Sequence, residues 1–149
     1  MSWTYPIGRE GVETLLPHRP PALLIHSVES FDGEVLHARV TTNPDWNIFD
    51  GHFPGRPILP GVILIEMIAQ AGALLGGISG IVEDGTFLAF SGVEKARFRR
   101  PIGPGETIDI HVELASSRRG LHRFKGRAEV GGQRAAVVEF TAAQMSFAG

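Results

Sequence analysis

The apolar positions of the chain are densest at residues 61–75, GVILIEMIAQAGALL, where Glu66 and Gln70 are the polar side chains. Pro60 precedes this run and suits the first turn of a helix, and Gly76–Gly77 can end one. A helix that is apolar on every side must be buried. The run is shorter than the roughly 20 residues that a membrane span needs, and it carries a carboxylate. It therefore predicts a central core helix, with no membrane as partner.

Elsewhere the apolar positions recur with a period of two, which is typical of strands. The predicted strands are Ala22–Val28, Val35–Thr42, Phe87–Val93, Ala96–Arg100, Thr107–Leu114, Gly120–Val130 and Gln133–Met145, the last two forming a hairpin around Gly131–Gly132. Prolines and glycines between 43 and 60 argue against any helix or central strand there. One buried helix among antiparallel strands predicts an α+β fold, a curved sheet wrapped around the helix. The free edge of such a sheet favours a dimer.

The composition narrows the class of protein further. A chain of 149 residues with 43% hydrophobic and 20% charged residues fits one soluble domain, 1–149. A net charge of -2 gives no overall attraction to nucleic acid or to an anionic membrane. The lack of cysteine excludes disulfides, thiolate metal sites and cysteine nucleophiles. No secretory signal is recognisable at the start, so we expect a cytoplasmic protein, without a metal or a bound cofactor.

Glu66 is a candidate proton donor, because it is the one charged residue of the predicted helix. Burying an unpaired carboxylate is costly, and such groups usually become neutral. A carboxyl group held in an apolar pocket can act as a general acid near neutral pH. The alternative is a structural acid, satisfied by the backbone or by a charge from elsewhere.

His52 is a candidate base, because it lies in a rigid loop, DGHFPGRP at 50–57, just before the helix. The other five histidines, His18, His26, His37, His111 and His122, lack such a setting. Gly61 at the helix start offers a backbone amide and the helix dipole to a carbonyl oxygen that gains negative charge. The alternatives are that His52 is structural and that Gly61 only permits the turn into the helix.

A base, an acid and a carbonyl-polarising amide together suit proton abstraction next to a carbonyl group. With a hydroxyl group on the β carbon, such a site eliminates water. The residues do not identify the acyl group.

From Leu16 to about Ala143 the sequence resembles the hot-dog-fold 3-hydroxyacyl-[acyl-carrier-protein] dehydratases of bacterial type II fatty acid synthesis (FabZ-like). The resemblance rests on several motifs in order: Leu16–Arg19, Gly51–Pro57, Pro60–Val62, Glu66–Gln70, Lys95–Pro101 and Pro104–Gly105. It implies a hydro-lyase that converts a (3R)-3-hydroxyacyl thioester into a trans-2-enoyl thioester. The substrate then arrives on an acyl carrier protein through a phosphopantetheine arm.

The resemblance also assigns roles to single residues. It implies that His52 removes the α proton, that Glu66 assists departure of the β hydroxyl, and that the Gly61 amide polarises the thioester carbonyl. Glu rather than Asp at 66 resembles the branch that only dehydrates. In this family the histidine and the acid of each site come from two subunits, which implies a homodimer, with a trimer of dimers left open.

Two further groups of residues are implied. The acyl tunnel is expected to contain Phe53, Pro54, Val62 and Ala89. The acidic carrier protein is expected to bind a basic cluster of Lys95, Arg97, Arg99 and Arg100. Because strand residues alternate in direction, only part of this cluster can face the carrier; a merely solvated face is the alternative. The sequence departs from the family at Leu24–Ser27, where relatives usually have Leu-Val-Asp-Arg, and at Ala89, where many have a tyrosine. Both departures leave chain length and pathway open, including a specialised aryl or acyl pathway.

Two other functions compete with dehydration. A hot-dog acyl-CoA thioesterase also uses an acid on the central helix, but it needs an attacking water rather than a histidine placed for the α proton. A non-catalytic acyl-carrier-binding subunit needs neither His52 nor Glu66, and both are present.

Overall fold

The computed structural model describes residues 2–147. In chain order its elements are α1 (Arg9–Leu15), β1 (Ser27–Phe31), β2 (Val35–Thr41), α2 (Ile48–Gly51), α3 (Gly61–Ser79), β3 (Thr86–Phe98), β4 (Thr107–Arg118), β5 (Leu121–Val130) and β6 (Gln133–Ser146).

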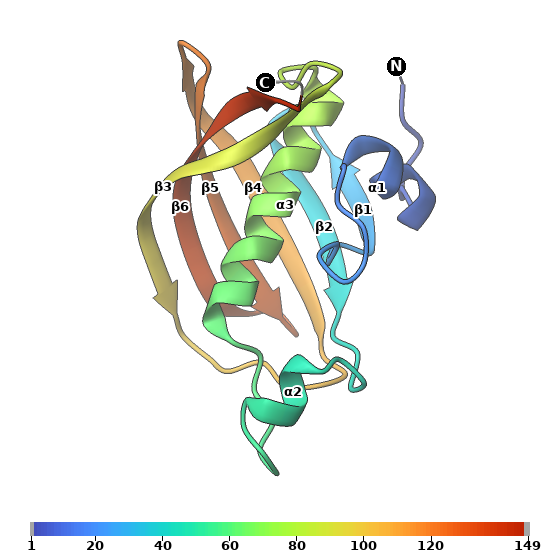
Figure 1. Cartoon of the computed structure of the whole chain (residues 1–149), viewed down its shortest axis with the longest axis vertical. Helices are drawn as coiled ribbons and strands as arrows, with labels where there is room; N and C mark the ends of the chain where they lie inside the picture. Colours follow the sequence, from blue (N-terminus) through green and yellow to red (C-terminus); the bar gives the residue numbers. More distant parts are fainter. Residues whose placement is uncertain (1, 148–149) are drawn as a thin grey trace.

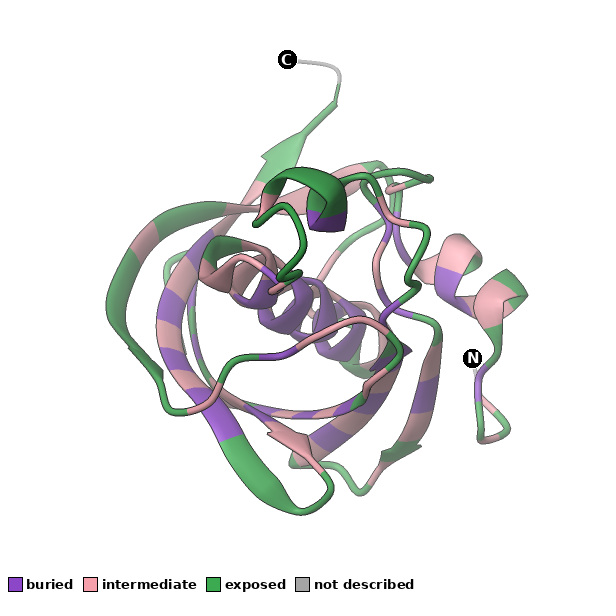
Figure 2. Cartoon of the chain, turned by 90° about the horizontal axis from the view of Figure 1, so that it is seen from below, coloured by how far each residue is buried: buried purple, intermediate pink, exposed green. Residues whose placement is uncertain are grey.

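All six strands form one antiparallel sheet in the order β1-β2-β4-β5-β6-β3. The sheet curves around α3, which lies in its hollow face (Figures 1 and 2). α1 lies beside the β1 edge, whereas no strand among the described residues pairs with the outer edge of β3. This is the predicted hot-dog fold, and the prediction is confirmed.

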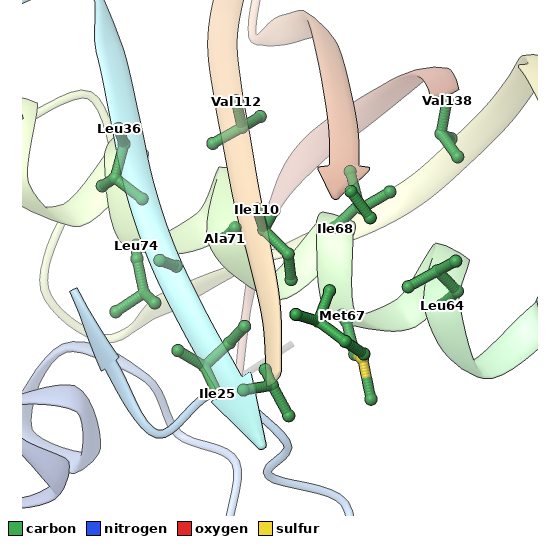
Figure 3. Close-up of a cluster of buried hydrophobic side chains, with 14 of the residues drawn as sticks. Ile25, Leu36, Leu64, Met67, Ile68, Ala71, Leu74, Ile110, Val112 and Val138 are labelled. Carbon is green, nitrogen blue, oxygen red and sulfur yellow. The ribbon is translucent and has the colours of Figure 1, made fainter. Parts of the chain in front are cut away.

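The core lies between α3 and the hollow face of the sheet (Figure 3). Met67, Ile68 and Leu74 of the helix are fully buried, each worth roughly 1.5–3 kcal/mol relative to exposure. Gly126 of β5 lets the helix come this close, because a Cβ there would lie 2.4 Å from the Ile68 side chain. α3 is long and apolar enough to cross a membrane. Half of its apolar stretch is buried within the protein, so it is a core helix.

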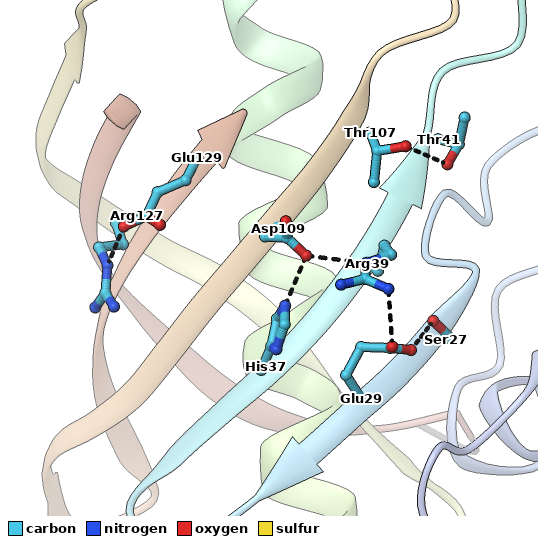
Figure 4. A network of polar contacts seen from close by, with 9 residues as sticks. All are labelled: Ser27, Glu29, His37, Arg39, Thr41, Thr107, Asp109, Arg127 and Glu129. Carbon is cyan, nitrogen blue, oxygen red and sulfur yellow. Dashed lines mark hydrogen bonds and ion pairs between the residues drawn. The ribbon is translucent and has the colours of Figure 1, made fainter. Parts of the chain in front are cut away.

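The outer face of the sheet is polar, as the alternation predicts (Figure 4). Asp109 accepts hydrogen bonds from His37 at 2.7 Å and from Arg39 at 2.9 Å. Burial would raise the pKa of Asp109, but these two donors outweigh it and hold the pKa below its usual range. The His37 ring stacks on that of His111, with centroids 4.4 Å apart. These histidines support the sheet, away from the helix.

Two predictions before α3 are wrong in detail. Residues 22–26 are not a strand, because the Leu24 N–H donates to the Gln70 side chain of α3 rather than to a sheet neighbour. The proline-rich segment 43–60 does contain a helix, the single turn of α2, which fits between two of its prolines. Its buried Phe49 stacks on Trp46, with ring centroids 6.2 Å apart.

Two boundaries after the helix start also differ from the prediction. α3 continues through Gly76–Gly77 and ends at Gly80, whose φ of 83° suits a glycine. Gly76 serves packing instead, because a Cβ there would lie 2.6 Å from the Val82 side chain. β3 is one strand of 13 residues rather than two, and two register irregularities, at 90–92 and 93–95, replace the predicted break.

Candidate active site

The loop that carries His52 is tied to itself by hydrogen bonds. Ile58 N–H donates to the His52 carbonyl at 2.7 Å, and Phe53 and Arg56 exchange two backbone bonds of 3.0 and 2.8 Å. The Phe53 ring stacks on the imidazole, with centroids 4.1 Å apart. The Leu59 N–H then donates to the Ile102 carbonyl oxygen, which joins the loop to the segment between β3 and β4. The imidazole is therefore held in one place, as predicted from the Gly/Pro setting.

The tautomer of His52 follows from its one side-chain bond. Its Nδ1 lies 2.8 Å from the Ile58 carbonyl oxygen. Because a carbonyl oxygen can only accept, Nδ1 carries the proton, and the lone pair of Nε2 is free. This is the form that a general base needs.

Gly61 begins α3 directly after Pro60, and no side chain caps this helix end. The first N–H groups of a helix have no partner within the helix, so they can bind a carbonyl oxygen. A Cβ on Gly61 would lie 3.0 Å from two ring atoms of Phe98. The glycine therefore serves close packing, and the role of its amide in binding a carbonyl oxygen stays a prediction.

Glu66 is held by Gln70 one turn later, whose Nε2 donates to Glu66 Oε2 at 2.9 Å. Gln70 is 1% exposed, accepts from Leu24 N–H and donates to the Ala22 carbonyl. His18 Nε2 lies 3.9 Å from the same Glu66 oxygen. Sequence reasoning missed Gln70 and His18 as site residues. The one-turn spacing from Glu66 to Gln70 was the available signal for the first.

The expected burial of Glu66 is wrong for the single subunit, where its side chain is 39% exposed. The curved sheet covers one side of α3 and leaves the side of Val62, Glu66, Ala69 and Ala73 only partly covered. Val62 on that side is 70% exposed. Exposed apolar surface of this kind is typical of an interaction site, and residues 2–147 leave it partly uncovered.

His52 and Glu66 open into two different pockets of the same subunit. The first pocket contains His52, Gly61, Val62 and Phe98, among other residues. The second is lined by His18, Glu66, Ala69, Gln70, Ala73, Phe87, Leu88, Ala89, Phe90, Phe140 and Ala142. The predicted base and carbonyl site therefore lie together in one pocket, and the predicted acid lies in the other.

The tunnel residues divide in the same way. Val62 lines the pocket of His52, and Ala89 that of Glu66. Phe53 and Pro54 line neither, and Phe53 is 52% exposed on its loop.

The basic cluster also divides. Lys95 and Arg99 line a pocket on the outer face of the sheet, and strand alternation puts exposed Arg97 on the same side. Arg99 reaches the pocket of His52 as well. Arg100 lies on the opposite side and forms a 2.9 Å ion pair with Glu106. Lys95 also pairs with Glu139 at 3.8 Å, so Arg97 and Arg99 are the members of the cluster without an ion pair within residues 2–147.

Comparison with known proteins decides the family. The model of the FabA-like domain matches residues 16–139. The chain belongs to the FabA-like family. It is 44% identical over 131 residues to the 3-hydroxyacyl-[acyl-carrier-protein] dehydratase FabZ of Syntrophotalea carbinolica, covering 86% of this chain and 88% of the relative. It is 43% identical to FabZ of Klebsiella pneumoniae, covering 87% of both chains. These FabZ homologues confirm the predicted dehydratase family and hydro-lyase class.

Solved structures agree on the fold. The dehydratase heterocomplex ApeI:P from Xenorhabdus doucetiae superposes with a TM-score of 0.74 at 24% identity, covering 92% of both chains. A thioesterase from Haemophilus influenzae superposes with a TM-score of 0.67 at 15% identity, covering 98% of this chain and 96% of the other. At such identities the likeness shows the hot-dog fold alone, so it gives no support to a thioesterase function.

Proposed function

We propose that this FabA-like dehydratase removes water from 3-hydroxyacyl thioesters carried by acyl carrier protein, at sites built from two subunits. The observation that supports the shared site most directly is the separation of His52 and Glu66 into two pockets of one chain. The names of the FabZ relatives supply the substrate class.

The surface of the subunit supports a dimer through β3. This edge strand has 13 residues, and exposes Phe90 at 45% and Val93 at 46%. An unpaired edge of this length is a template for another strand. Glu66 opens beside the same strand, because Phe87 to Phe90 line its pocket. A partner joined at β3 therefore brings its own His52 loop toward Glu66 and covers the exposed side of α3.

The reaction at such a shared site uses each group once. Nε2 of His52 takes the α proton, and the Gly61 amide stabilises the negative charge on the carbonyl oxygen. Glu66 of the partner subunit gives a proton to the β hydroxyl, the C–O bond breaks, and water leaves with a trans-2-enoyl thioester remaining. A carboxyl group acts as such a donor in its protonated form.

The carrier protein is proposed to dock on the outer-face cations. The last part of β3 and the residue after it carry three cations on one side, Lys95, Arg97 and Arg99. Arg99 also lines the His52 pocket. An acidic carrier bound there would have its phosphopantetheine arm close to His52.

Mixing two inactive variants tests the shared site. Wild type should dehydrate 3-hydroxybutyryl-[acyl-carrier-protein] and hydrate the crotonyl thioester, whereas His52→Ala and Glu66→Gln homodimers should each be inactive. After subunit exchange, mixed dimers should regain up to one working site of two. Exchange proven by native mass spectrometry without any regain of activity would place both groups in one chain.

A further inference from the structure

His18 is a titratable group in the Glu66 pocket that the mechanism above leaves without a task. Its Nε2 lies 3.9 Å from Glu66 Oε2. Its Nδ1 is buried and has no hydrogen-bond partner among the described residues. A buried polar atom without a partner costs free energy, which sets this imidazole apart from an ordinary solvated histidine.

No other titratable side chain lines this pocket besides His18 and Glu66, within residues 2–147. The guanidinium of the neighbouring Arg19 is engaged by backbone and by Glu13: it donates to the carbonyl oxygens of Leu16, His18 and Glu13 and pairs with the Glu13 carboxylate. His18 is therefore the one proton-exchanging group placed to serve Glu66 from the same subunit.

The two oxygens of the Glu66 carboxylate differ in their contacts. Oε2 accepts from Gln70 and faces His18. Oε1 has no hydrogen bond within the described part of the chain. One oxygen is thus tied to the supporting groups, and the other is free for the β hydroxyl. The His18 side chain is 27% exposed in the single chain, before any partner covers this side of α3.

We propose that His18 reloads Glu66 with a proton after each dehydration; this rests on the function proposed above. When the C–O bond breaks, Glu66 has given its proton to the leaving hydroxyl and is a carboxylate. The His18 imidazolium passes a proton to Glu66 and takes another from solvent. His52 meanwhile releases the α proton to solvent, so the cycle closes without net gain or loss. The 3.9 Å gap exceeds a hydrogen bond, but catalytic contacts in unliganded sites are often long.

Kinetics of two His18 variants test this role. His18→Gln keeps a hydrogen-bonding side chain without proton transfer, so kcat should fall roughly tenfold to a hundredfold, with KM within about twofold of wild type. His18→Ala should lose as much and regain kcat when imidazole is added. His26→Gln is the matched control, because His26 lines neither the Glu66 pocket nor the His52 pocket, and it should keep wild-type kcat. An unchanged kcat in both folded variants, or a loss that imidazole leaves untouched, would overturn the proposal.

A second measurement separates this proposal from the proposed function. The ¹⁵N signals of the His18 imidazole, followed by NMR at fixed pH in the wild-type assembly, should shift in Glu66→Gln and stay in place in His26→Gln. This readout needs no turnover. His18 signals that keep the same position in Glu66→Gln would overturn the His18–Glu66 pairing, even in an active enzyme. If wild type is inactive but the His18 signals shift in Glu66→Gln, the proposed function is contradicted and the His18–Glu66 pairing is supported.

Discussion

Gln70 Nε2 donates a hydrogen bond to Glu66 Oε2 over 2.9 Å, from one turn further along α3. Because the same amide also binds the Ala22 carbonyl and the Leu24 N–H, the carboxylate is tied to the segment before β1. Gln70 is a positioning residue in this arrangement. It holds the acid without taking part in the chemistry itself.

Replacing Gln70 by methionine tests that role. Gln70→Met keeps the length of the side chain but leaves two backbone groups unpaired, so the free energy of unfolding should fall by about 2–4 kcal/mol. At a temperature where the variant is folded, kcat should fall at least about tenfold with little change in KM, as positioning errors do. Gln144→Met is the control, because it removes one surface bond to Glu83 N–H. Wild-type kcat in folded Gln70→Met would contradict the positioning role.

Gly61 has two possible reasons to be glycine, and a pair of variants separates them. Gly61→Ala places a Cβ 3.0 Å from the Phe98 ring and next to the amide that would receive the thioester carbonyl. We expect activity on crotonyl-[acyl-carrier-protein] to fall by roughly a hundredfold, the size of a lost oxyanion contact. The double variant Gly61→Ala/Phe98→Leu makes room for the methyl group. If the double variant regains full activity, the glycine serves packing alone.

The central helix and the meander could be predicted from the sequence, because both depend on local periodicity. The run from Gly61 and the alternation from Thr107 agree with α3 and β4. The strand predicted at Ala22–Val28 begins too early, because Gln70 binds the Ala22 carbonyl and the Leu24 N–H, tertiary bonds that no local pattern carries. The helix end was misplaced because Gly76 is required by the contact with Val82, not by a turn.

The candidate site was predictable only where chemistry and sequence setting coincide. His52 stands out through its loop, and Glu66 through the apolar run around it. His18 belongs to the Leu16–Arg19 motif of the resemblance, but it is distant from both in sequence and no local pattern links it to Glu66. Its contact with Glu66 exists only because residues 16–24 pass across α3. The separation of the two pockets likewise depends on the curvature of the sheet.

A charge on the free edge of β3 should separate the subunits. Val93→Glu places a carboxylate on a strand position that is 46% exposed in the single chain and that we place at the dimer contact. Sedimentation or light scattering should show a monomer. Dehydration should be lost, because the two subunits that contribute to each site are separated. Glu34→Gln, in the β1–β2 turn away from β3, should leave the assembly unchanged. A dimeric, active Val93→Glu protein would contradict the β3 interface.

His111 should make the fold less stable in weak acid. Burial lowers the pKa of His111 below its usual range, with further lowering by Arg127 and His37 against opposing effects of Glu129 and Asp109. The unfolded chain then binds more protons than the folded one as pH falls through about 6.5, so the free energy of unfolding decreases.

Urea unfolding at pH 8, 7, 6 and 5 measures this dependence. The decrease between about pH 7 and 5 should be smaller in His111→Gln, which cannot take up a proton. His26, whose pKa is lowered by burial and by Arg9, should contribute in the same direction. The double variant should therefore be flatter than either single one. An unchanged slope in His111→Gln would exclude His111 as the source.

The outer-face cations can be tested separately from the site, because the substrate has a small analogue without the carrier. Arg97→Glu/Arg99→Glu should raise KM for crotonyl-[acyl-carrier-protein] by roughly tenfold or more at low salt, since complementary charge governs such encounters. KM for crotonyl-pantetheine should change little, and added salt should narrow the difference between wild type and variant. Arg100→Gln is the contrasting variant: it loses the ion pair with Glu106, so it should affect stability more than carrier binding. Equal losses on both substrates would place the arginines in the catalytic site rather than on the carrier surface.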